Sequence, residues 1–264
     1  MKDNLLRHLG PHPWDSLITF VPQTDSTNTL AKTLARQGAP HGTVVLADSQ
    51  TCGRGRLGRS FSSPAGMGVY CSVILRPDCP PQALLHLTAM MAEAARRAIV
   101  AATGLSPMIK WVNDLILENK KICGILTELE ATPEKTDFVV VGVGINCRQT
   151  QEDFPPELRE MAASLSQISG QPIDPAAVAA ELIRQIALAA EDMLTNPDPW
   201  MDAYRSRCIT LHREVQIING EIIRRGYAED MDKTGGLLIR FPDGSRETVS
   251  SGEVSVRGLY GYAE

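Results

Sequence analysis

The chain has 264 residues, of which 43% are hydrophobic and 22% charged, and its formal net charge is -5 at pH 7. This length allows one large domain, or one domain with a small appendix, and the composition is typical of a globular protein with a sizeable core. The acidic balance argues against non-specific nucleic-acid binding, which normally requires a basic face, so any cationic feature must be local.

The cysteines and the N-terminal segment indicate the cellular setting. Six cysteines occur, none in a C-x-x-C pair and none with a histidine at zinc-ligand spacing. We therefore expect reduced, structural thiols in a cytoplasmic protein. Residues 1–16 are interrupted by charges, Gly and Pro, which argues against a signal peptide. No apolar run approaches the ~18 residues of a membrane span, so no membrane association is expected.

Most of the chain predicts strands that alternate with helices. β-branched and apolar runs predict strands at 14–21, 42–50, 66–75 and 137–147, and three short strands within 108–130, with turns at residues 113–114 and 119–120. Start and stop residues predict helices from Ser26 to Gly38 and over 80–104, and three more near 156–168, 175–195 and 198–208.

The tail changes character after residue 210. About five short strand-like runs alternate there with glycine turns, and Asn219-Gly220 is a strong two-residue hairpin signal. Such a series of short strands is typical of a small barrel. We therefore divide the chain into a domain over 1–210 and a small barrel over 211–264.

The stretch "TCGRGRLGRSF" at 51–61 is the most unusual segment of the sequence. It carries three glycines and three arginines between residues 53 and 59, and no acid occurs from residue 49 to residue 77. Glycines allow backbone N–H groups to approach a ligand, and arginines supply forked donors for carboxylate or phosphate. The loop by itself is equally compatible with an anion-binding loop and with an exposed, mobile loop whose arginines are solvated.

The glycines of this loop also satisfy G-x-G-x-x-G. A dinucleotide-binding turn requires a helix directly after the glycines, because the helix N-terminus holds the pyrophosphate. Residues 60–75 contain Pro64, Gly66 and Gly68 and then read as a strand. We therefore regard this match as accidental. The hypothesis of a nucleotide-dependent oxidoreductase rests only on this match, and we discount it as well.

Other polar clusters recur at strand ends and turns. They are "DSTN" (25–28), Gln50, "KWVND" (110–114), "KKICGILTE" (120–128) and "GVGIN" (142–146). With the loop, and in this order, they resemble the biotin protein ligase family, whose patterns are S-T-N, Q-x-x-G-R-G-R-x-G-R, K-W-P-N-D, K-(L/I)-x-G-I-L-x-E and G-(I/V)-G-I-N. The tail "SSGEVSVRG" (250–258) is similar to the closing pattern of that family. The resemblance runs from about residue 15 to the C-terminus.

Three features depart from the family pattern. Phe61 stands where the family usually has Trp, and Val112 where it usually has Pro. Both positions keep an apolar group. Larger members carry a helix-turn-helix domain before the S-T-N motif, whereas 25 residues precede Ser26 here. We therefore expect a short form of the family without DNA binding or a repressor role.

The resemblance implies a fold and a reaction. The fold is α+β: a mixed β-sheet with helices packed on one side, as in class II synthetases, followed by a small SH3-like β-barrel. The reaction is an ATP-dependent ligation. Biotin is first activated as biotinyl-5'-AMP, with Mg²⁺ accompanying ATP and no protein ligand assigned to the metal. The biotinyl group then passes to a specific lysine of a biotin carboxyl carrier domain.

The family pattern assigns roles to residues of this sequence. Biotin binding is assigned to Ser26, Thr27, Asn28, Gln50, Arg54, Gly55, Arg56 and Lys121. Nucleotide binding is assigned to Arg56, Arg59, Lys110, Asn113 and Asn146. Lys121 and Arg54 act in catalysis by stabilising negative charge, and Asp114 orients or deprotonates the acceptor lysine. Each position also has a plainer explanation: helix capping for Ser26, a surface lysine for Lys121, a simple turn for residues 113–114, and a structural amide for Asn146.

Two related functions stay open beside the ligase. One is a ligase or transferase for lipoate or octanoate, which shares the scaffold, although the "GRGRLGR" loop argues against it. The other is a biotin-binding sensor without catalysis, against which Lys121 argues. The resemblance also raises homodimerisation through paired sheet edges, and the sequence leaves it undecided.

Overall fold

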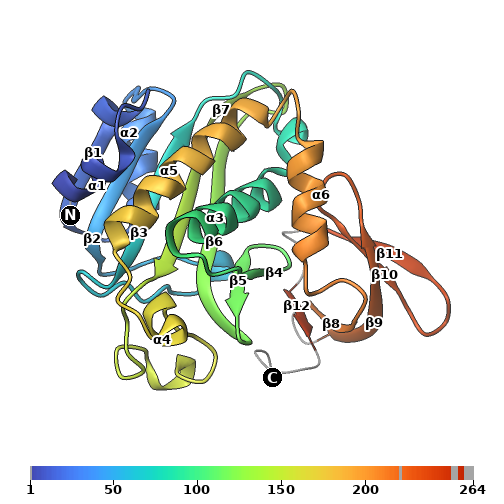
Figure 1. Cartoon of the computed structure of the whole chain (residues 1–264). Coiled ribbons are helices and arrows are strands. Elements are labelled where there is room, and N and C mark those ends of the chain that lie inside the picture. The colour runs from blue at the N-terminus through green and yellow to red at the C-terminus, as the bar shows by residue number, and fades with distance from the viewer. Residues whose placement is uncertain (1, 220–221, 251–254, 259–264) are drawn as a thin grey trace.

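The structure is a computed structural model that describes residues 2–219, 222–250 and 255–258. Most of the described helices surround a seven-stranded sheet, and a second sheet lies beside it (Figure 1). The strands of the large sheet are β1 (Ile18–Thr24), β2 (Thr43–Gln50), β3 (Gly68–Leu75), β4 (Met108–Lys110), β5 (Asp114–Leu117), β6 (Lys120–Ala131) and β7 (Thr136–Asn146). The helices are α1 (Lys2–Leu9), α2 (Thr27–Arg36), α3 (Leu87–Thr103), α4 (Leu165–Ser169), α5 (Pro175–Asp192) and α6 (Asp198–Arg207).

The large sheet is mixed, as predicted. Its order is β1-β2-β3-β7-β6-β5-β4. Strands β1 and β2 are parallel, and the other neighbouring pairs are antiparallel. In the long hairpin of β6 and β7, Gly124 lies opposite Gly144 and Leu126 lies opposite Gly142. Strand pairing thus brings the "GIL" and "GVGIN" motifs side by side.

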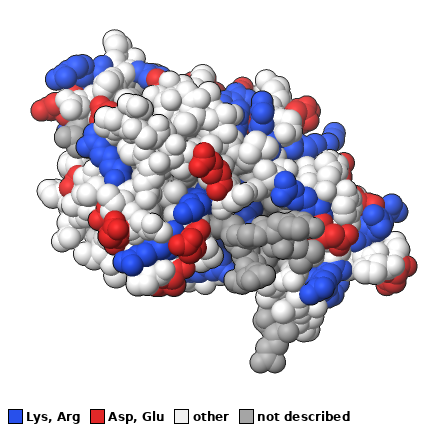
Figure 2. Space-filling model, turned by 60° about the horizontal axis from the view of Figure 1, so that its bottom comes forward, with Lys and Arg blue, Asp and Glu red and all other residues white. Residues whose placement is uncertain are grey.

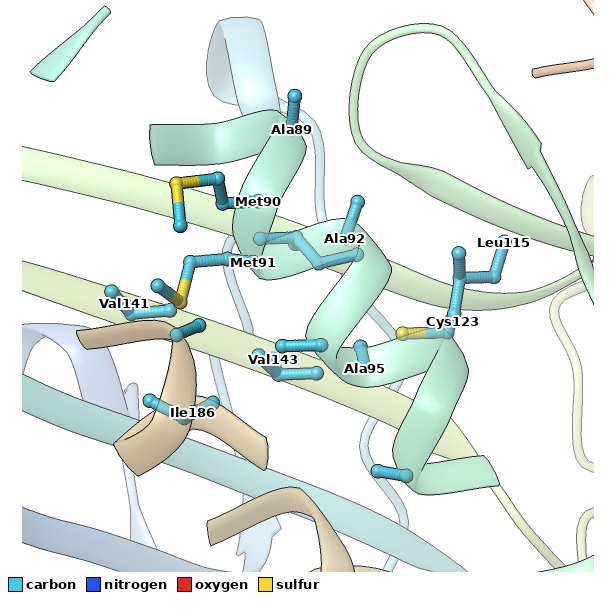
Figure 3. Packing of buried hydrophobic residues seen from close by; sticks show 14 of the residues in the cluster. Ala89, Met90, Met91, Ala92, Ala95, Leu115, Cys123, Val141, Val143 and Ile186 are labelled. Carbon is cyan, nitrogen blue, oxygen red and sulfur yellow. The ribbon is translucent and has the colours of Figure 1, made fainter. Parts of the chain in front are cut away.

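One face of this sheet is covered by α3 and α5. Met91 of α3 and Ile186 of α5 lie close to Val141 and Val143 of β7 (Figure 3). Strand β7 gives alternate residues to this core, because successive side chains of a strand point to opposite faces. The main hydrophobic core therefore lies between the sheet and these two helices.

Helix α2 lies on the opposite face. Its Ala31 and Ala35 pack against Val45, Ile74 and Val140 in a second, smaller core. The α+β class with a mixed sheet is confirmed, but α2 departs from the expectation that the helices lie on one side. Its narrow alanine face fits closely over the strands and leaves the rest of that sheet face for other groups.

Helix α1 is not predicted from the sequence. Its buried side chains are Leu5 and Leu9, which is too little apolar surface for a clear helical pattern. It packs against α5, from which Arg184 donates hydrogen bonds to the carbonyls of His8 and Leu9. Tertiary contacts, rather than local propensity, hold this helix.

The predicted helix at 156–168 is wrong. A 3-10 turn begins the segment, and the chain then pairs with β6: Lys121 N–H donates to the carbonyl of Met161 at 2.8 Å, and Ala163 N–H donates to the carbonyl of Lys121 at 3.0 Å. These backbone groups are therefore not available for a helix. The short α4 begins only after Ser164, whose side chain caps it.

Several predicted boundaries also shift. The strand expected at 14–21 is β1, which begins at Ile18 after a 3-10 turn. The helix expected over 80–104 begins at Leu87, because the prolines form a separate 3-10 turn. The second predicted turn of the 108–130 region is centred on Glu118 and Asn119, which both have positive φ, as a tight hairpin requires.

The C-terminal strands form a second, antiparallel sheet. They are β8 (Glu214–Asn219), β9 (Ile222–Met231), β10 (Leu237–Arg240), β11 (Arg246–Val249) and β12 (Ser255–Gly258), in the order β11-β10-β9-β8-β12. This confirms a small antiparallel β-region, while its closure into a barrel stays a prediction. Gly220 of the hairpin signal and residues 251–254 of the tail motif lie outside the described residues.

Within the described ranges, α3 and α5 are the longest helices, and neither they nor any other is apolar over enough residues to span a bilayer. Figure 2 shows basic and acidic side chains interspersed over the face that it draws.

Candidate active site

A cavity of about 410 Å³ opens on the sheet face that carries α2. Its walls come from the start of α2, the loop after β2, the β4–β5 turn (residues 110–114), strands β6 and β7, and residues 154–162. All thirteen residues predicted to be functional line it: Ser26, Thr27, Asn28, Gln50, Arg54, Gly55, Arg56, Arg59, Lys110, Asn113, Asp114, Lys121 and Asn146. The fold thus brings them together.

The N-terminus of α2 forms a polar end of the cavity. Ser26 is at the N-cap position but its side chain makes no capping hydrogen bond, so the capping role suggested by the sequence is wrong. Its N–H instead donates to Asp25 Oδ1 at 2.6 Å. Gln50 Oε1 accepts from the N–H and the hydroxyl of Thr27 at 2.8 and 3.1 Å, and Gln50 Nε2 donates to Ser63 Oγ at 2.8 Å. The Gln50 amide is therefore held in one orientation.

Asn28 lies in a buried polar cluster below this end. Its Oδ1 accepts from Ser72 Oγ at 2.6 Å, and its Nδ2 donates to Glu128 Oε2 at 2.9 Å and to the Leu126 carbonyl at 3.3 Å. Ser72 Oγ also lies 2.8 Å from Thr27 Oγ1. Because the Asn28 amide is engaged on both sides, its contribution to a ligand site includes holding its neighbours in place.

Glu128 is the anion of this cluster. Its Oε1 lies 2.7 Å from Lys32 Nζ and 3.4 Å from Arg54 Nη2. Burial acts to raise the pKa of Glu128, but hydrogen bonds from Lys32 and Asn28 outweigh it, so the pKa is lowered. Glu128 therefore stays ionised and attracts the Arg54 guanidinium.

The glycine–arginine loop forms a compact turn over the cavity. Gly55 N–H donates to the Arg59 carbonyl at 2.7 Å, and Phe61 N–H donates to the Gly53 carbonyl at 2.8 Å. Leu57 at the tip has a φ of 55° and is 64% exposed. The next long element is strand β3 rather than a helix, which agrees with the rejection of a dinucleotide-binding turn.

Two further cations of the cavity are paired with residues of the β4–β5 turn. Lys121 Nζ lies 2.7 Å from Asp114 Oδ1, and Arg56 Nη1 donates to Asn113 Oδ1 at 3.2 Å. Burial lowers the pKa of the Arg56 guanidinium, which nevertheless stays charged at neutral pH. The cavity therefore concentrates positive charge that protein side chains partly neutralise.

Glycines form the floor of the cavity. A Cβ at Gly142 would lie 2.0 Å from Asn28 Oδ1, and one at Gly144 would lie 2.5 Å from the Phe61 ring. Gly124, opposite Gly144 in the sheet, faces the Phe61 ring and the Lys121 side chain. The glycines thus allow the side chains of Asn28 and Phe61 to lie directly against the strands.

The segments 123–126 and 142–145, which the sequence suggests as lining of an apolar channel, do contribute Ile125, Leu126 and Val143 to the cavity. Sequence reasoning missed the rest of its apolar wall. Phe61 was read only as a family substitution, and Phe154, Leu158 and Met161 were placed near or inside a helix that does not form. Phe61 could have been identified as a lining residue from the sequence, because it lies three residues after the last glycine of the loop. The other three have no local signal, because the pairing of Lys121 with residues 161–163 positions them.

Asn146 is held mainly by protein groups. Its Nδ2 donates to the Ala163 carbonyl at 3.2 Å, and its Oδ1 accepts from Gln149 Nε2 at 3.2 Å. Gln149, a buried amide that sequence reasoning missed, also approaches the Tyr70 hydroxyl at 3.5 Å. This network favours a structural role for Asn146 at the edge of the cavity.

The described residues include no cluster of three or more His, Cys, Asp or Glu side chains suited to hold a metal ion. Asp114 is the one carboxylate among the described lining residues. The donor set therefore fits a metal that arrives with phosphate oxygens as its ligands better than a resident metal centre.

Comparison with known proteins identifies the family of this chain. The profile of the "Biotin/lipoate A/B protein ligase family" matches residues 20–146, and that of the "Biotin protein ligase C terminal domain" matches residues 210–257. The chain is 38% identical over 229 residues to the bifunctional ligase/repressor BirA of Bacillus spizizenii, covering 86% of this chain and 70% of the relative. The chain belongs to the biotin protein ligase family.

Two further relatives resemble this ligase-family chain over most of their length. The biotin–[acetyl-CoA-carboxylase] ligase of Mycobacterium tuberculosis is 33% identical over 244 residues, which cover 90% of this chain and 88% of the relative. The structure of the biotin protein ligase from Aquifex aeolicus in complex with biotin and ATP aligns with a TM-score of 0.77 at 29% identity. That alignment covers 91% of this chain and 98% of the other.

Proposed function

We propose that this protein is an ATP-dependent ligase that activates biotin as biotinyl-5'-AMP and transfers it to a lysine of a biotin carboxyl carrier domain. The observation that carries the proposal is the convergence of Arg54, Arg56 and Lys121 on one cavity that also has a fixed neutral polar end and a glycine floor. Relatives named as biotin–[acetyl-CoA-carboxylase] ligases support the same assignment.

The polar end fits the ureido head of biotin. A ureido group needs both donors and acceptors, and the hydroxyls of Ser26 and Thr27 together with the Gln50 amide offer both. The apolar side chains that line the cavity, among them Phe61, Ile125 and Val143, would face the ring and the apolar chain. The biotin carboxylate would then lie toward Arg56 and Lys121.

The cations serve the first step. A biotin carboxylate oxygen attacks the α-phosphorus of ATP, and pyrophosphate leaves. Negative charge develops on phosphorus oxygens in this step, and fixed cations in a partly enclosed cavity stabilise it. Arg54, Arg56 and Lys121 act there, while Arg59, Lys110 and Asn113 contact the nucleotide. Mg²⁺ would come with ATP and offset phosphate charge; we assign it no protein ligand.

The second step transfers the acyl group. The amine nitrogen of the acceptor lysine attacks the acyl carbon, AMP leaves, and the amine gives up a proton. A free lysine amine has a pKa of about 10.4 and is mostly protonated at neutral pH. Asp114 lines the cavity, and we assign it to attract the ammonium and to accept this proton.

The wider setting follows from the same proposal. The carrier is a domain of a biotin-dependent carboxylase, docked near the cavity mouth, and the enzyme works in the cytoplasm, where its six cysteines stay as free thiols. We retain homodimerisation through sheet edges, and the division into domains at 1–210 and 211–264, as predictions.

A transfer assay tests the proposal. Purified protein is mixed with ATP, Mg²⁺, labelled biotin and a biotin carrier domain, and label on the carrier lysine is measured by mass spectrometry. A carrier in which that lysine is replaced by Arg is the control. Label on the wild-type carrier alone supports the ligase. Tight biotin binding without transfer indicates a sensor, and transfer of lipoate in place of biotin indicates the related acyl ligase.

A further inference from the structure

The β4–β5 turn, residues 110–114, is held from outside by the C-terminal part of the chain. The Trp111 N–H donates to Thr210 Oγ1 at 3.0 Å, and the Trp111 indole Nε1 donates to the Gly235 carbonyl at 2.8 Å. The Tyr204 hydroxyl donates to the Val112 carbonyl at 3.2 Å. Three hydrogen bonds from α6, the connector after it and the small sheet therefore reach two consecutive residues of one short turn.

These contacts are shielded from water. Trp111 is 5% exposed, Thr210 is 6% exposed and Tyr204 is fully buried. A buried hydrogen bond whose partner is removed leaves an unsatisfied polar group, which costs more than the bond itself contributes. The turn is therefore fixed strongly at Trp111 and Val112, directly before Asn113 and Asp114.

The β9–β10 turn, residues 232–236, is built to present the Gly235 carbonyl. Asp232 Oδ1 accepts from Thr234 N–H at 2.8 Å, from Thr234 Oγ1 at 2.7 Å and from Gly236 N–H at 2.9 Å. Gly235 has a φ of 89°, and a Cβ there would contact Ala89 of α3. Only a glycine fits this conformation without strain. The turn is thus rigid and rests on the large domain.

The inner side of the β4–β5 turn faces the cavity. Asn113 Nδ2 donates to the Ile125 carbonyl at 2.8 Å, and Asn113 Oδ1 accepts from Arg56 at 3.2 Å. By contrast, the polar end with Thr27 and Gln50 is tied to β2 and β3 through its own hydrogen bonds. A shift of the turn should therefore move the nucleotide side of the cavity more than the biotin head side.

We propose that Trp111 and Tyr204 are positioning residues, through which the C-terminal sheet and α6 set the place of the nucleotide-side groups Lys110, Asn113 and Asp114. The proposal rests on the function proposed above, and it goes beyond it by assigning the small sheet a part in nucleotide affinity. The connection runs from Asp232 to Gly235, from Gly235 to Trp111, and from Trp111 to the cavity.

The test compares ligand affinities in matched variants. Trp111→Phe removes the indole N–H and keeps an aromatic ring, and Tyr204→Phe removes only a hydroxyl. Trp200→Phe is the control, because Trp200 is 3% exposed and its Nε1 donates to Asp192 Oδ2 at the same 2.8 Å, away from the turn. Asp232→Ala disrupts the β9–β10 turn, and Asp232 is exposed and lies outside the cavity.

Calorimetry would measure the Kd of biotin alone and the Kd of a non-hydrolysable ATP analogue in the presence of biotin. We expect Trp111→Phe, Tyr204→Phe and Asp232→Ala to weaken analogue binding by about tenfold, with the biotin Kd changed by less than about threefold. Trp200→Phe should lower the Tm and leave both Kd values near those of the wild type.

Equal losses of analogue binding in Trp111→Phe and Trp200→Phe would overturn the proposal, and so would equal losses for biotin and the analogue. Wild-type analogue affinity in Asp232→Ala would remove the small sheet from the connection. If Trp111→Phe does not fold, Tyr204→Phe and Asp232→Ala decide the question. A wild-type protein that binds neither biotin nor the analogue contradicts the proposed function itself, which is a separate result.

Discussion

Lys121 reaches Asp114 across the surface of Gly124. In the β5–β6 pairing Asp114 lies opposite Gly124, and a bulge follows between Leu115 and Ile116. The Lys121 Cε and Nζ pass 3.2 and 3.3 Å from the position that a Cβ at residue 124 would take, and Nζ ends 2.7 Å from Asp114 Oδ1. A Cβ at position 124 would be in tight contact with the end of the lysine side chain, so the glycine lets the lysine cross the strand without being displaced.

Substitution of Lys121 tests its role in adenylation. Lys121→Ala should lower the rate of biotinyl-AMP formation by about 100- to 1,000-fold, the usual effect of removing one fixed group that stabilises transition-state charge. The fold should persist, because partly exposed ion pairs contribute little to stability. Pyrophosphate release measures the rate, and Lys120→Ala is the matched control. A wild-type rate in Lys121→Ala would exclude the lysine from the mechanism.

Arg56 should retain the reactive intermediate. Its guanidinium links the loop to Asn113 of the β4–β5 turn, so Arg56→Gly should let biotinyl-AMP escape and react with free amines. Chromatography of the reaction without carrier measures free adenylate. Leu57→Gly is the control, because it loosens a position already at positive φ and keeps every arginine. Free adenylate from both variants alike would assign the effect to loop flexibility instead.

The glycine floor should not tolerate a methyl group at position 142. Gly142→Ala would place a Cβ 2.0 Å from Asn28 Oδ1, and Asn28 is fixed by Ser72 and Glu128. We expect a loss of about 1–3 kcal/mol in the free energy of unfolding and a strong loss of biotin affinity. Gly144→Ala, which meets the Phe61 ring instead, should cost less stability. Equal denaturation midpoints for the two variants would contradict this account.

The carboxylate of Glu128 should stabilise the protein only while it is ionised. Its pKa is lowered in the folded state, so its contribution is present above the unfolded pKa, about 4.3, and is lost as the pH falls through the lower folded pKa. Glu128→Gln should therefore be less stable than the wild type at pH 7. The difference should shrink below about pH 4. Urea denaturation across pH 3 to 7 measures it, and a pH-independent difference would show that the ionised carboxylate is not responsible.

The strands and the site residues were largely predictable, because their signals are local. Alternating or apolar runs indicate strands whatever their neighbours, and each motif marks a strand end or a turn that the fold then brings to one cavity. The polarity of Ser26 and the charge of Arg56 require a partner or solvent in any fold.

The features that the sequence did not reveal depend on distant contacts. Helix α1 is held by hydrogen bonds from Arg184 of α5. The segment at 161–163 forms backbone hydrogen bonds with Lys121 in place of helical ones. The tie between Trp111 and Gly235 joins positions more than a hundred residues apart, and no local pattern at either residue announces it.

Strand β7 acts as a partition between two compartments. Its odd-numbered residues, such as Val141 and Val143, belong to the main core, whereas Gly142 and Gly144 face the cavity. A side chain added at Gly142 or Gly144 would press on Asn28 or Phe61, and Val143 borders the cavity as well as the core. Ligand selectivity and heat resistance are therefore coupled along this single segment of the chain.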